Sequence, residues 1–234
     1  GGSYTSITGA TGENYASPSL SVDTWYRRQA TSVLNGTQCV LTTAPIAITV
    51  NNIDPGSIGG TQTICEGATP AALTSAAASG DGTISYQWQD SPDGSTFTDI
   101  PGETGATFAP TALSADRWYQ RVTTSDLAGF DCVESSNIIK VTVNNFMPGN
   151  IAADQTICEN TAPAPLTSIT PTGDGIFTYR WFRSTDGSSF GVIGTAVSET
   201  YSPGLLTQDT WYVREVKSTL GTNSCVENTD TILI

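Results

Sequence analysis

The chain has 234 residues and a formal net charge of −13, with nine Lys and Arg residues against 22 Asp and Glu residues. Nucleic acids and anionic membranes both attract clustered cations, so we expect neither nucleic-acid binding nor membrane insertion. No apolar run approaches the roughly 20 residues of a membrane-spanning helix. The chain contains no His, which removes the commonest general base and metal ligand. We therefore expect no enzyme, no cofactor and no metal site, although paired-carboxylate chemistry stays open in principle.

One motif occurs three times at a constant spacing. DTWYRR begins at Asp23, DRWYQR at Asp116 and DTWYVR at Asp209, and the differences 116 − 23 and 209 − 116 both equal 93. This period is typical of whole tandem domains, because solenoid repeats are only about 20–50 residues long. The related stretches ITVNN and VTVNN end at positions 52 and 145. We predict a C-terminal half repeat over 1–52, a complete repeat over 53–145 and a nearly complete repeat over 146–234.

The complete repeat has the pattern of an all-β domain. Gly and Pro recur about every ten residues, helix-forming residues are scarce, and short apolar stretches alternate with polar residues. We expect about seven strands, over 61–65, 72–79, 84–90, 97–101, 106–113, 117–125 and 137–145. This number and spacing are typical of an immunoglobulin-like sandwich. The predicted fold is therefore all-β, with tandem immunoglobulin-like β-sandwich domains of about seven strands each in an extended array.

Aromatic and Arg positions support the sandwich. A lone Trp in a central strand matches the core Trp of such domains, and a Tyr after Leu-x-x-Asp matches their tyrosine corner. Period-2 alternation places this Tyr and the second Arg of the motif on one face of a strand. We expect that Arg to pack against the central Trp or to pair with a carboxylate. The predicted structural residues are Trp88, Trp181, Tyr26, Tyr119, Tyr212, Arg28, Arg121 and Arg214.

The ligand, if there is one, stays unknown from the sequence. Trp25, Trp118 and Trp211 would suit sugar stacking if they faced outward, although packing within or between domains is the favoured interpretation. The Asp-Gly turns would suit calcium only if several carboxylates converged, since calcium takes six to eight oxygen ligands. No such acidic run occurs, so we interpret these turns as ordinary hairpin turns.

The five cysteines allow two pairing schemes. Cys65 and Cys132 are 67 residues apart (132 − 65), as are Cys158 and Cys225 (225 − 158). We favour these two pairs, because each repeat is then stapled independently and only Cys39 lacks a partner. The alternative pairs Cys39 with Cys65 and Cys132 with Cys158, and leaves Cys225 alone. Either scheme predicts an oxidising, extracellular compartment.

The motifs QTICEG at 62–67, YQWQDSPDGS at 86–95 and WYQR at 118–121 carry a family resemblance. Together they resemble the immunoglobulin-like tandem repeats of Bacteroidota cell-surface adhesins, including SprB-type adhesins of gliding motility. The resemblance covers essentially the whole chain and implies no catalytic residues. It implies a filament at the cell surface that is exported by type IX secretion and grips the substratum.

Residues and resemblance together lead to two expectations for function. The first is a structural and adhesive segment of a cell-surface adhesin that supports attachment and gliding motility. Its expected partners are neighbouring repeats, surface polysaccharide or another substratum, and secretion and motility machinery that acts through regions outside this segment. The alternative is a spacer or carbohydrate-binding segment of a secreted polysaccharide-degrading enzyme.

Overall fold

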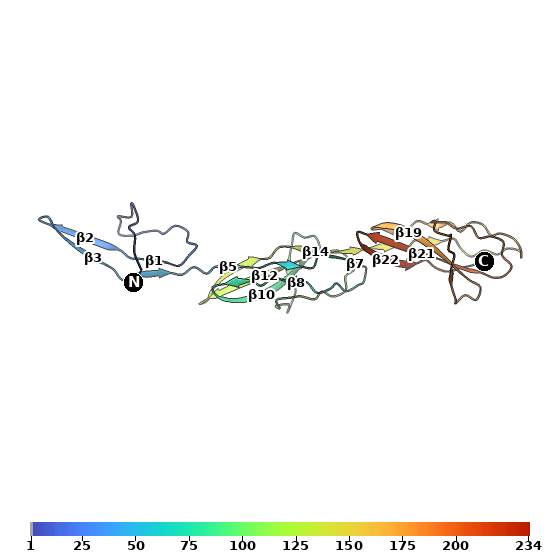
Figure 1. Cartoon of the computed structure of the whole chain (residues 1–234), viewed down its shortest axis with the longest axis horizontal. Helices are drawn as coiled ribbons and strands as arrows, with labels where there is room; N and C mark the ends of the chain where they lie inside the picture. The colour runs from blue at the N-terminus through green and yellow to red at the C-terminus, as the bar shows by residue number, and fades with distance from the viewer. Residues whose placement is uncertain (1) are drawn as a thin grey trace. The chain divides into compact units, whose positions relative to one another are not determined.

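The computed structural model describes residues 2–234, and these residues form 23 strands and no helix. The all-β prediction is therefore confirmed. Contacts divide the chain into two compact units, one of residues 1–55, 78–85 and 123–134 and one of 56–77, 86–122 and 135–234. The first repeat lies in the first unit, the third repeat lies in the second, and the middle repeat contributes to both. Figure 1 colours the chain from blue at the N-terminus to red at the C-terminus and labels several of its strands.

The first repeat consists of two small antiparallel ladders. β1 (Thr24–Tyr26) pairs with β4 (Ile46–Ile48), and β2 (Gln29–Leu34) pairs with β3 (Thr37–Thr42). The β2–β3 hairpin turns at Asn35-Gly36, where both φ angles are positive, as the twist of a two-residue hairpin requires. Every side chain of β2 and β3 is exposed.

The middle repeat is organised around one sheet in the order β11-β10-β12-β14-β7, with β13 beside β12. β7 runs parallel to β14, so that Asn144 lies opposite Cys65 at the end of both strands. Two short ladders, β5–β9 and β6–β8, complete the repeat. The strand bounds are β5 (Ile53–Asp54), β6 (Ile58–Gly59), β7 (Gln62–Cys65), β8 (Thr74–Ser75), β9 (Ser79–Gly80), β10 (Thr83–Ser91), β11 (Thr98–Asp99), β12 (Arg117–Leu127), β13 (Phe130–Ser135) and β14 (Ile139–Asn144).

The third repeat reproduces this arrangement 93 residues later. Its sheet has the order β20-β19-β21-β22, with β23 beside β21, and β15–β18 and β16–β17 form the short ladders. Ile151 lies opposite Ser168 just as Ile58 lies opposite Ser75. The bounds are β15 (Phe146–Met147), β16 (Asn150–Ile151), β17 (Ser168–Ile169), β18 (Thr172–Gly173), β19 (Ile176–Ser184), β20 (Gly191–Val192), β21 (Trp211–Leu220), β22 (Asn223–Asn228) and β23 (Ile232–Leu233).

The core of each complete repeat combines sheet residues with residues of the short ladders and loops. Trp88 and Trp181 are fully buried, and each indole N–H donates to a backbone carbonyl, that of Gly105 or Ser198. In the middle repeat the cluster joins sheet residues to Ile58, Leu73 and Phe108 from outside the sheet, as expected of a sandwich. The corresponding cluster of the third repeat contains Ile151, Leu166, Trp181, Ala196, Tyr212, Ile232 and Ile234.

Several strands differ from those expected. The stretch 106–113 is not a strand and contributes only an isolated bridge between Leu73 and Phe108. In contrast, β13 was not expected, although it carries Cys132. The middle repeat has ten strands rather than about seven. Five of them are very short: β5, β6, β8, β9 and β11 contain only two residues each. The immunoglobulin-like topology stays a prediction.

Candidate functional site

One face of the strand that carries the WYxR motif is buried from the motif Tyr to a Ser six residues later. On β21 the buried residues are Tyr212, Arg214, Val216 and Ser218, and the residues between them are half-buried or exposed. β12 alternates in the same way, with Tyr119, Arg121, Thr123 and Ser125 buried. Strand side chains alternate between faces, so the buried face of one strand carries first a core Tyr, then a buried Arg and finally a buried Ser.

The buried Arg is held by oxygen atoms of the surrounding loops. Arg214 donates through Nη1 to Ser168 Oγ and to the Glu199 carbonyl at 2.8 Å, and through Nη2 to the Pro148 carbonyl at 2.9 Å. Burial lowers the pKa of this guanidinium, because water no longer solvates its charge. These hydrogen bonds replace part of the lost hydration. Glu199 accepts through its backbone oxygen, and its carboxylate acts on the guanidinium through its charge alone.

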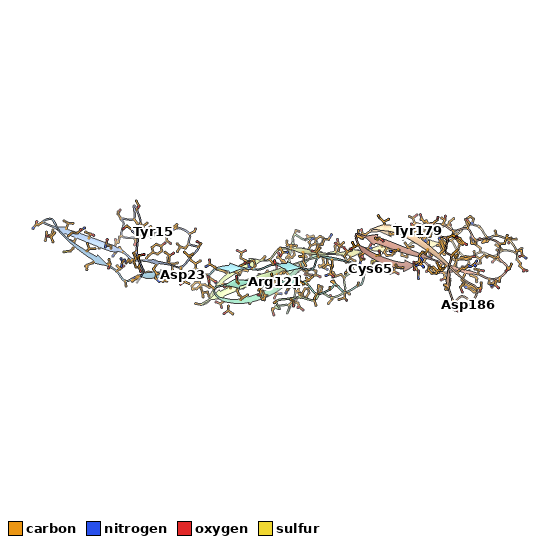
Figure 2. All side chains as sticks on the ribbon, viewed as in Figure 1. Tyr15, Asp23, Cys65, Arg121, Tyr179 and Asp186 are labelled. Atoms are coloured by element: carbon orange, nitrogen blue, oxygen red, sulfur yellow. A yellow bond between two sulfur atoms is a disulfide. The ribbon has the colours of Figure 1, made fainter. Side chains whose placement is uncertain are left out.

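Arg121, labelled in Figure 2, is the equivalent residue of the middle repeat and is also fully buried. It donates to Ser75 Oγ and to the Ala106 carbonyl at 2.9 Å. The aromatic partner differs from our expectation. Arg121 lies 4.3 Å from the ring centroid of Tyr86, two residues before Trp88, and Arg214 lies 5.3 Å from that of Tyr179. Tyr86 and Trp88 are two residues apart and therefore share a face of β10. The Trp indole lies in the core, so the Tyr ring is the one that contacts the guanidinium.

The prediction of a core role for Tyr26 and Arg28 is wrong for this chain. Tyr26 is half-buried beside Tyr15, and Arg28 is exposed. Arg28 keeps one equivalent bond, from Nη1 to the Glu13 carbonyl at 3.2 Å. The counterparts of Ser75 and Ala76, which cover Arg121, would lie at 75 − 93 and 76 − 93, before residue 1. The Arg stays exposed because the residues that would cover it are not in the chain.

The motif tryptophans pack on the Ser-x-Asp-Gly-Ser turn. A Cβ on Gly94 would lie 3.0 Å from the Trp118 ring, and one on Gly187 would lie 3.2 Å from the Trp211 ring. Both rings are half-buried, and the Lys140 ammonium lies 4.7 Å from the Trp118 ring centroid. Trp25 is 54 % exposed. The turn glycine therefore supplies a flat surface for the indole, which is a structural role.

The Asp of this turn is satisfied by the turn itself. Asp186 Oδ1 accepts the Ser188 and Ser189 backbone N–H groups at 2.8 and 2.7 Å and the Ser184 hydroxyl at 2.7 Å. These hydrogen bonds, led by the one from Ser189, hold the pKa of Asp186 well below its ordinary value. Asp93 is held in the same way. Among residues 2–234, no group of three or more Cys, Asp and Glu side chains is placed to hold a metal ion.

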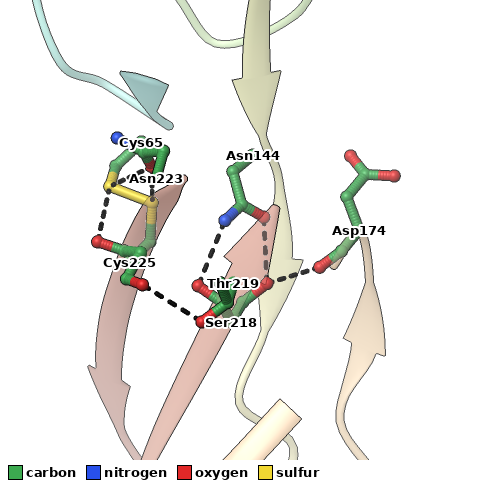
Figure 3. Close-up of a disulfide and its surroundings, with 8 residues drawn as sticks. Cys65, Asn144, Asp174, Ser218, Thr219, Asn223 and Cys225 are labelled. Carbon is green, nitrogen blue, oxygen red and sulfur yellow. Dashed lines mark hydrogen bonds between the residues drawn. A yellow bond between two sulfur atoms is a disulfide. The ribbon is translucent and has the colours of Figure 1, made fainter. Parts of the chain in front are cut away.

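The third repeat meets the middle one through a buried polar pair (Figure 3). Ser218 Oγ donates to Asn144 Oδ1 at 3.0 Å, and Asn144 Nδ2 donates to the Ser218 carbonyl at 3.2 Å. Asn144 is 1 % exposed and Ser218 is fully buried. Next to them, the Asp174 backbone N–H donates to the Asn145 carbonyl at 2.7 Å. We call this set of contacts the junction.

The first and middle repeats meet through the same junction. Ser125 Oγ donates to Asn51 Oδ1 at 2.7 Å, and Asn51 Nδ2 donates to the Ser125 carbonyl at 2.6 Å. The Asp81 backbone N–H donates to the Asn52 carbonyl at 3.1 Å. Since 144 − 51 and 218 − 125 both equal 93, the two junctions use equivalent residues. Buried polar groups of this kind fix one geometry, because any other docking leaves them without partners.

A disulfide joins Cys65 of the middle repeat to Cys225 of the third, across 160 residues. Cys65 ends β7 beside Asn144, and Cys225 lies on β22 opposite Ser218. The bond therefore adjoins the Asn144–Ser218 pair, as Figure 3 shows. Cys39 and Cys158 are free and exposed, and Cys132 is free and half-buried.

Both predicted pairing schemes are wrong. The scheme within repeats needs Cys65 with Cys132 and Cys158 with Cys225, but Cys65 and Cys225 are bonded to each other, and Cys132 and Cys158 are free. β7 runs parallel to β14 and places Cys65 beside Asn144, which contacts Ser218 of the third repeat. Cys65 therefore lies at the boundary with the third repeat. The scheme across adjacent cysteines fails because Cys65 is bonded to Cys225.

A family comparison agrees with the repeat pattern in outline. A profile described as a domain of unknown function, DUF8696, matches residues 1–52, 54–145 and 147–234. The chain belongs to this family. The second and third DUF8696 matches begin one residue after the repeat boundaries that the sequence predicts. A comparison with curated proteins finds no match.

Sequence reasoning missed the Asn and Ser residues of the DUF8696 junction. Asn51 and Asn144 were used only to mark the repeat ends, and Ser125 and Ser218 were not considered. Their identity at a spacing of 93 is the signal that would have found them. No helix among the described residues is long and apolar enough to span a membrane.

Proposed function

We propose that this chain is a structural segment of a cell-surface adhesin built from tandem DUF8696 repeats. The observation that carries the proposal is the junction, which has the same Asn–Ser geometry at both repeat boundaries and a covalent bond at one of them. A string of freely jointed domains needs no such contacts. A segment that transmits tension or keeps a fixed domain orientation does need them.

The disulfide supports the proposed compartment. Disulfides persist in oxidising environments and are rare in the cytosol, so the bond between Cys65 and Cys225 favours an extracellular location. The resemblance to gliding-motility adhesins extends the proposal to attachment, gliding and export by type IX secretion. Surface polysaccharide or another substratum is the proposed external partner, and neighbouring repeats are the internal ones.

The disulfide gives this segment a mechanical property. Tension between the two ends of the chain passes from Cys65 directly to Cys225, so residues 66–224 carry none of it. Those 159 residues could otherwise extend by up to roughly 570 Å at 3.6 Å per residue. An adhesin under shear benefits from this limit, because residues 66–224 stay folded under load.

Single-molecule pulling between the chain ends tests the load-bearing role. Under oxidising conditions we expect no extension from residues 66–224, and a reductant should release several hundred ångströms of additional length. Cys65→Ser should extend fully without a reductant, whereas the control Cys158→Ser should behave as wild type. Full extension of the oxidised wild-type chain would contradict the load-bearing role.

A spacer or carbohydrate-binding role in a secreted polysaccharide-degrading enzyme is the second candidate. The exposed ring of Trp25 favours it, because exposed indoles stack on sugars. A glycan array probed with the chain and with Trp25→Ala tests whether this segment binds sugar through Trp25. A purely structural segment should give the same array signal with the chain and with the variant. Tight binding of one glycan that Trp25→Ala abolishes would favour a carbohydrate-binding segment over a purely structural one.

A further inference from the structure

We propose that consecutive repeats are joined by a continuous disulfide ladder, in which the early cysteine of each repeat bonds to the late cysteine of the next. The early cysteines are Cys65 and Cys158, and the late cysteines are Cys39, Cys132 and Cys225. The bond between Cys65 and Cys225 is the one rung whose two ends both lie within this chain. This inference concerns the linkage alone and holds for either proposed function.

The ladder accounts for every free cysteine. A rung spans 160 residues, so the partner of Cys132 would lie at 132 − 160 = −28 and that of Cys39 at 39 − 160 = −121. The partner of Cys158 would lie at 158 + 160 = 318. All three positions lie beyond residues 1 and 234. The three free thiols are therefore the three cysteines that the rule leaves without a partner in this chain.

The β2–β3 hairpin is the matching docking surface for a preceding repeat. Ser32 and Cys39 lie opposite each other on it, as Ser218 and Cys225 do on the β21–β22 hairpin. Ser218 and Cys225 are buried under the middle repeat, whereas Ser32 and Cys39 are exposed. The occupant we assign is the end of another DUF8696 repeat, with an Asn for Ser32 and an early cysteine for Cys39.

A second exposed residue of this hairpin fits the same occupant. Leu34 is 74 % exposed, but its counterparts Leu127 and Leu220 are half-buried. Thus the positions that are covered in the other two repeats are the ones uncovered in the first. The apolar side chain gains from burial at about 25 cal/mol per Å² of covered surface.

Each rung forms by thiol–disulfide exchange with an external disulfide such as oxidised glutathione. One cysteine thiolate attacks glutathione disulfide and releases one glutathione thiolate, giving a mixed disulfide. The second cysteine thiolate then attacks the protein sulfur and releases the other glutathione thiolate. Two protein thiols are oxidised, one glutathione disulfide is reduced to two thiols, and the junction contributes by holding the two sulfurs together.

Overlap between rungs makes the ladder redundant. A rung spans 160 residues and repeats every 93, so consecutive loops share 160 − 93 = 67 residues. Cys158 accordingly lies inside the loop that Cys65 and Cys225 close. When one rung is reduced in a long array, the two neighbouring disulfides stay intact. The loops that they close still contain most of the residues of the opened loop.

Two lengthened chains test the ladder. In the first, a copy of residues 53–93 precedes residue 1, which completes the first repeat and places a copy of Cys65 at position −28. In the second, a copy of residues 142–234 follows Ile234 and places a copy of Cys225 at position 318. Each chain is refolded in a glutathione redox buffer, alkylated and mapped by mass spectrometry without reduction, and hydrogen exchange reports whether the added segment folds.

The ladder predicts one new disulfide in each chain. Cys132 should bond to the added copy of Cys65 in the first chain, and Cys158 to the added copy of Cys225 in the second, with each thiol losing its reactivity towards alkylation. Changing only the added cysteine to Ser should restore that reactivity. The proposal is overturned if Cys132 or Cys158 stays reactive beside a protected added segment, or if the added cysteine bonds within its own repeat. If one added segment does not fold, the other chain decides.

Discussion

Asn144 and Ser218 hold each other across the junction by two hydrogen bonds, and Asn51 and Ser125 repeat this pair 93 residues earlier. Each Ser is the last buried residue on the inner face of its strand, after the Tyr and the Arg of the motif. The strand that contributes to the core of a repeat thus also carries the Ser hydroxyl that bonds the Asn side chain of the preceding repeat. Folding of a repeat and docking of the preceding repeat therefore depend on the same strand.

Ser218→Ala should destabilise the junction by about 1–3 kcal/mol, because Asn144 Oδ1 stays buried without its donor. Hydrogen exchange of the β21–β22 amides measures the effect locally. Ser32→Ala is the matched control, since Ser32 is the equivalent residue but is exposed. It should change exchange by less than about 0.5 kcal/mol. Equal effects of the two changes would show that the buried pair has no special role.

Cys65→Ser should lower the stability of the second and third repeats. Opening a 160-residue loop lowers the free energy of unfolding by about 5 kcal/mol, because the unfolded chain regains conformational entropy. Urea unfolding followed by Trp fluorescence gives the shift in midpoint. Cys158→Ser changes a free, exposed thiol and should leave the midpoint unchanged. A Cys65→Ser chain as stable as wild type would refute the stabilising role of the bond.

Arg214→Lys should destabilise the third repeat by about 2–3 kcal/mol. The guanidinium donates in several fixed directions, to Ser168, Glu199 and Pro148, and a Lys ammonium cannot reproduce that fork. Arg28→Lys is the control at the equivalent motif position, where the Arg is exposed. It should have little effect on the thermal midpoint. A tolerated Lys at 214 would mean that the buried charge needs only one partner.

Stability should fall as the pH drops below about 4. The pKa values of Asp93 and Asp186 are depressed in the folded chain by hydrogen bonds from their turns, relative to an ordinary value of 3.8. A depressed pKa stabilises the fold above the unfolded value, and this stabilisation is lost as protons bind at lower pH. The double change to Asn keeps the acceptor oxygens but does not titrate.

Thermal midpoints at pH 7 and pH 2.5 measure that dependence. The double Asn variant of Asp93 and Asp186 should lose less stability between the two pH values than wild type does. Asp131→Asn, at an exposed position on β13, serves as the control. An identical loss in the double variant and in wild type would remove these two turns as a source of acid sensitivity.

The sequence predicts the long strands well and the junction poorly, for physical reasons. β10, β12 and β14 alternate over six or more residues beside a buried face, which leaves a clear period of two. β13 has one half-buried residue, Cys132, among exposed ones, so it carries no such period. Because β13 and its counterpart β22 were not predicted, the hairpin that carries Cys225 to the middle repeat was missed.

The buried Arg and the junction pair also show where pattern reasoning stops. The alternation places Arg121 on the buried face, but its partners come from Ser75 and Ala106, in loops without periodicity. The Asn–Ser pair joins residues 74 positions apart in different repeats. Neither contact can be derived from one copy of the repeat, because the partner position depends on how loops and neighbouring repeats dock.

Non-reducing peptide mapping of the oxidised 234-residue chain tests the central claim most directly. The account predicts one linked peptide pair, containing Cys65 and Cys225, and three thiols that react with an alkylating agent: Cys39, Cys132 and Cys158. Two linked pairs, Cys65 with Cys132 and Cys158 with Cys225, would contradict it, because each repeat would then be closed on itself and the junction would have no covalent bond.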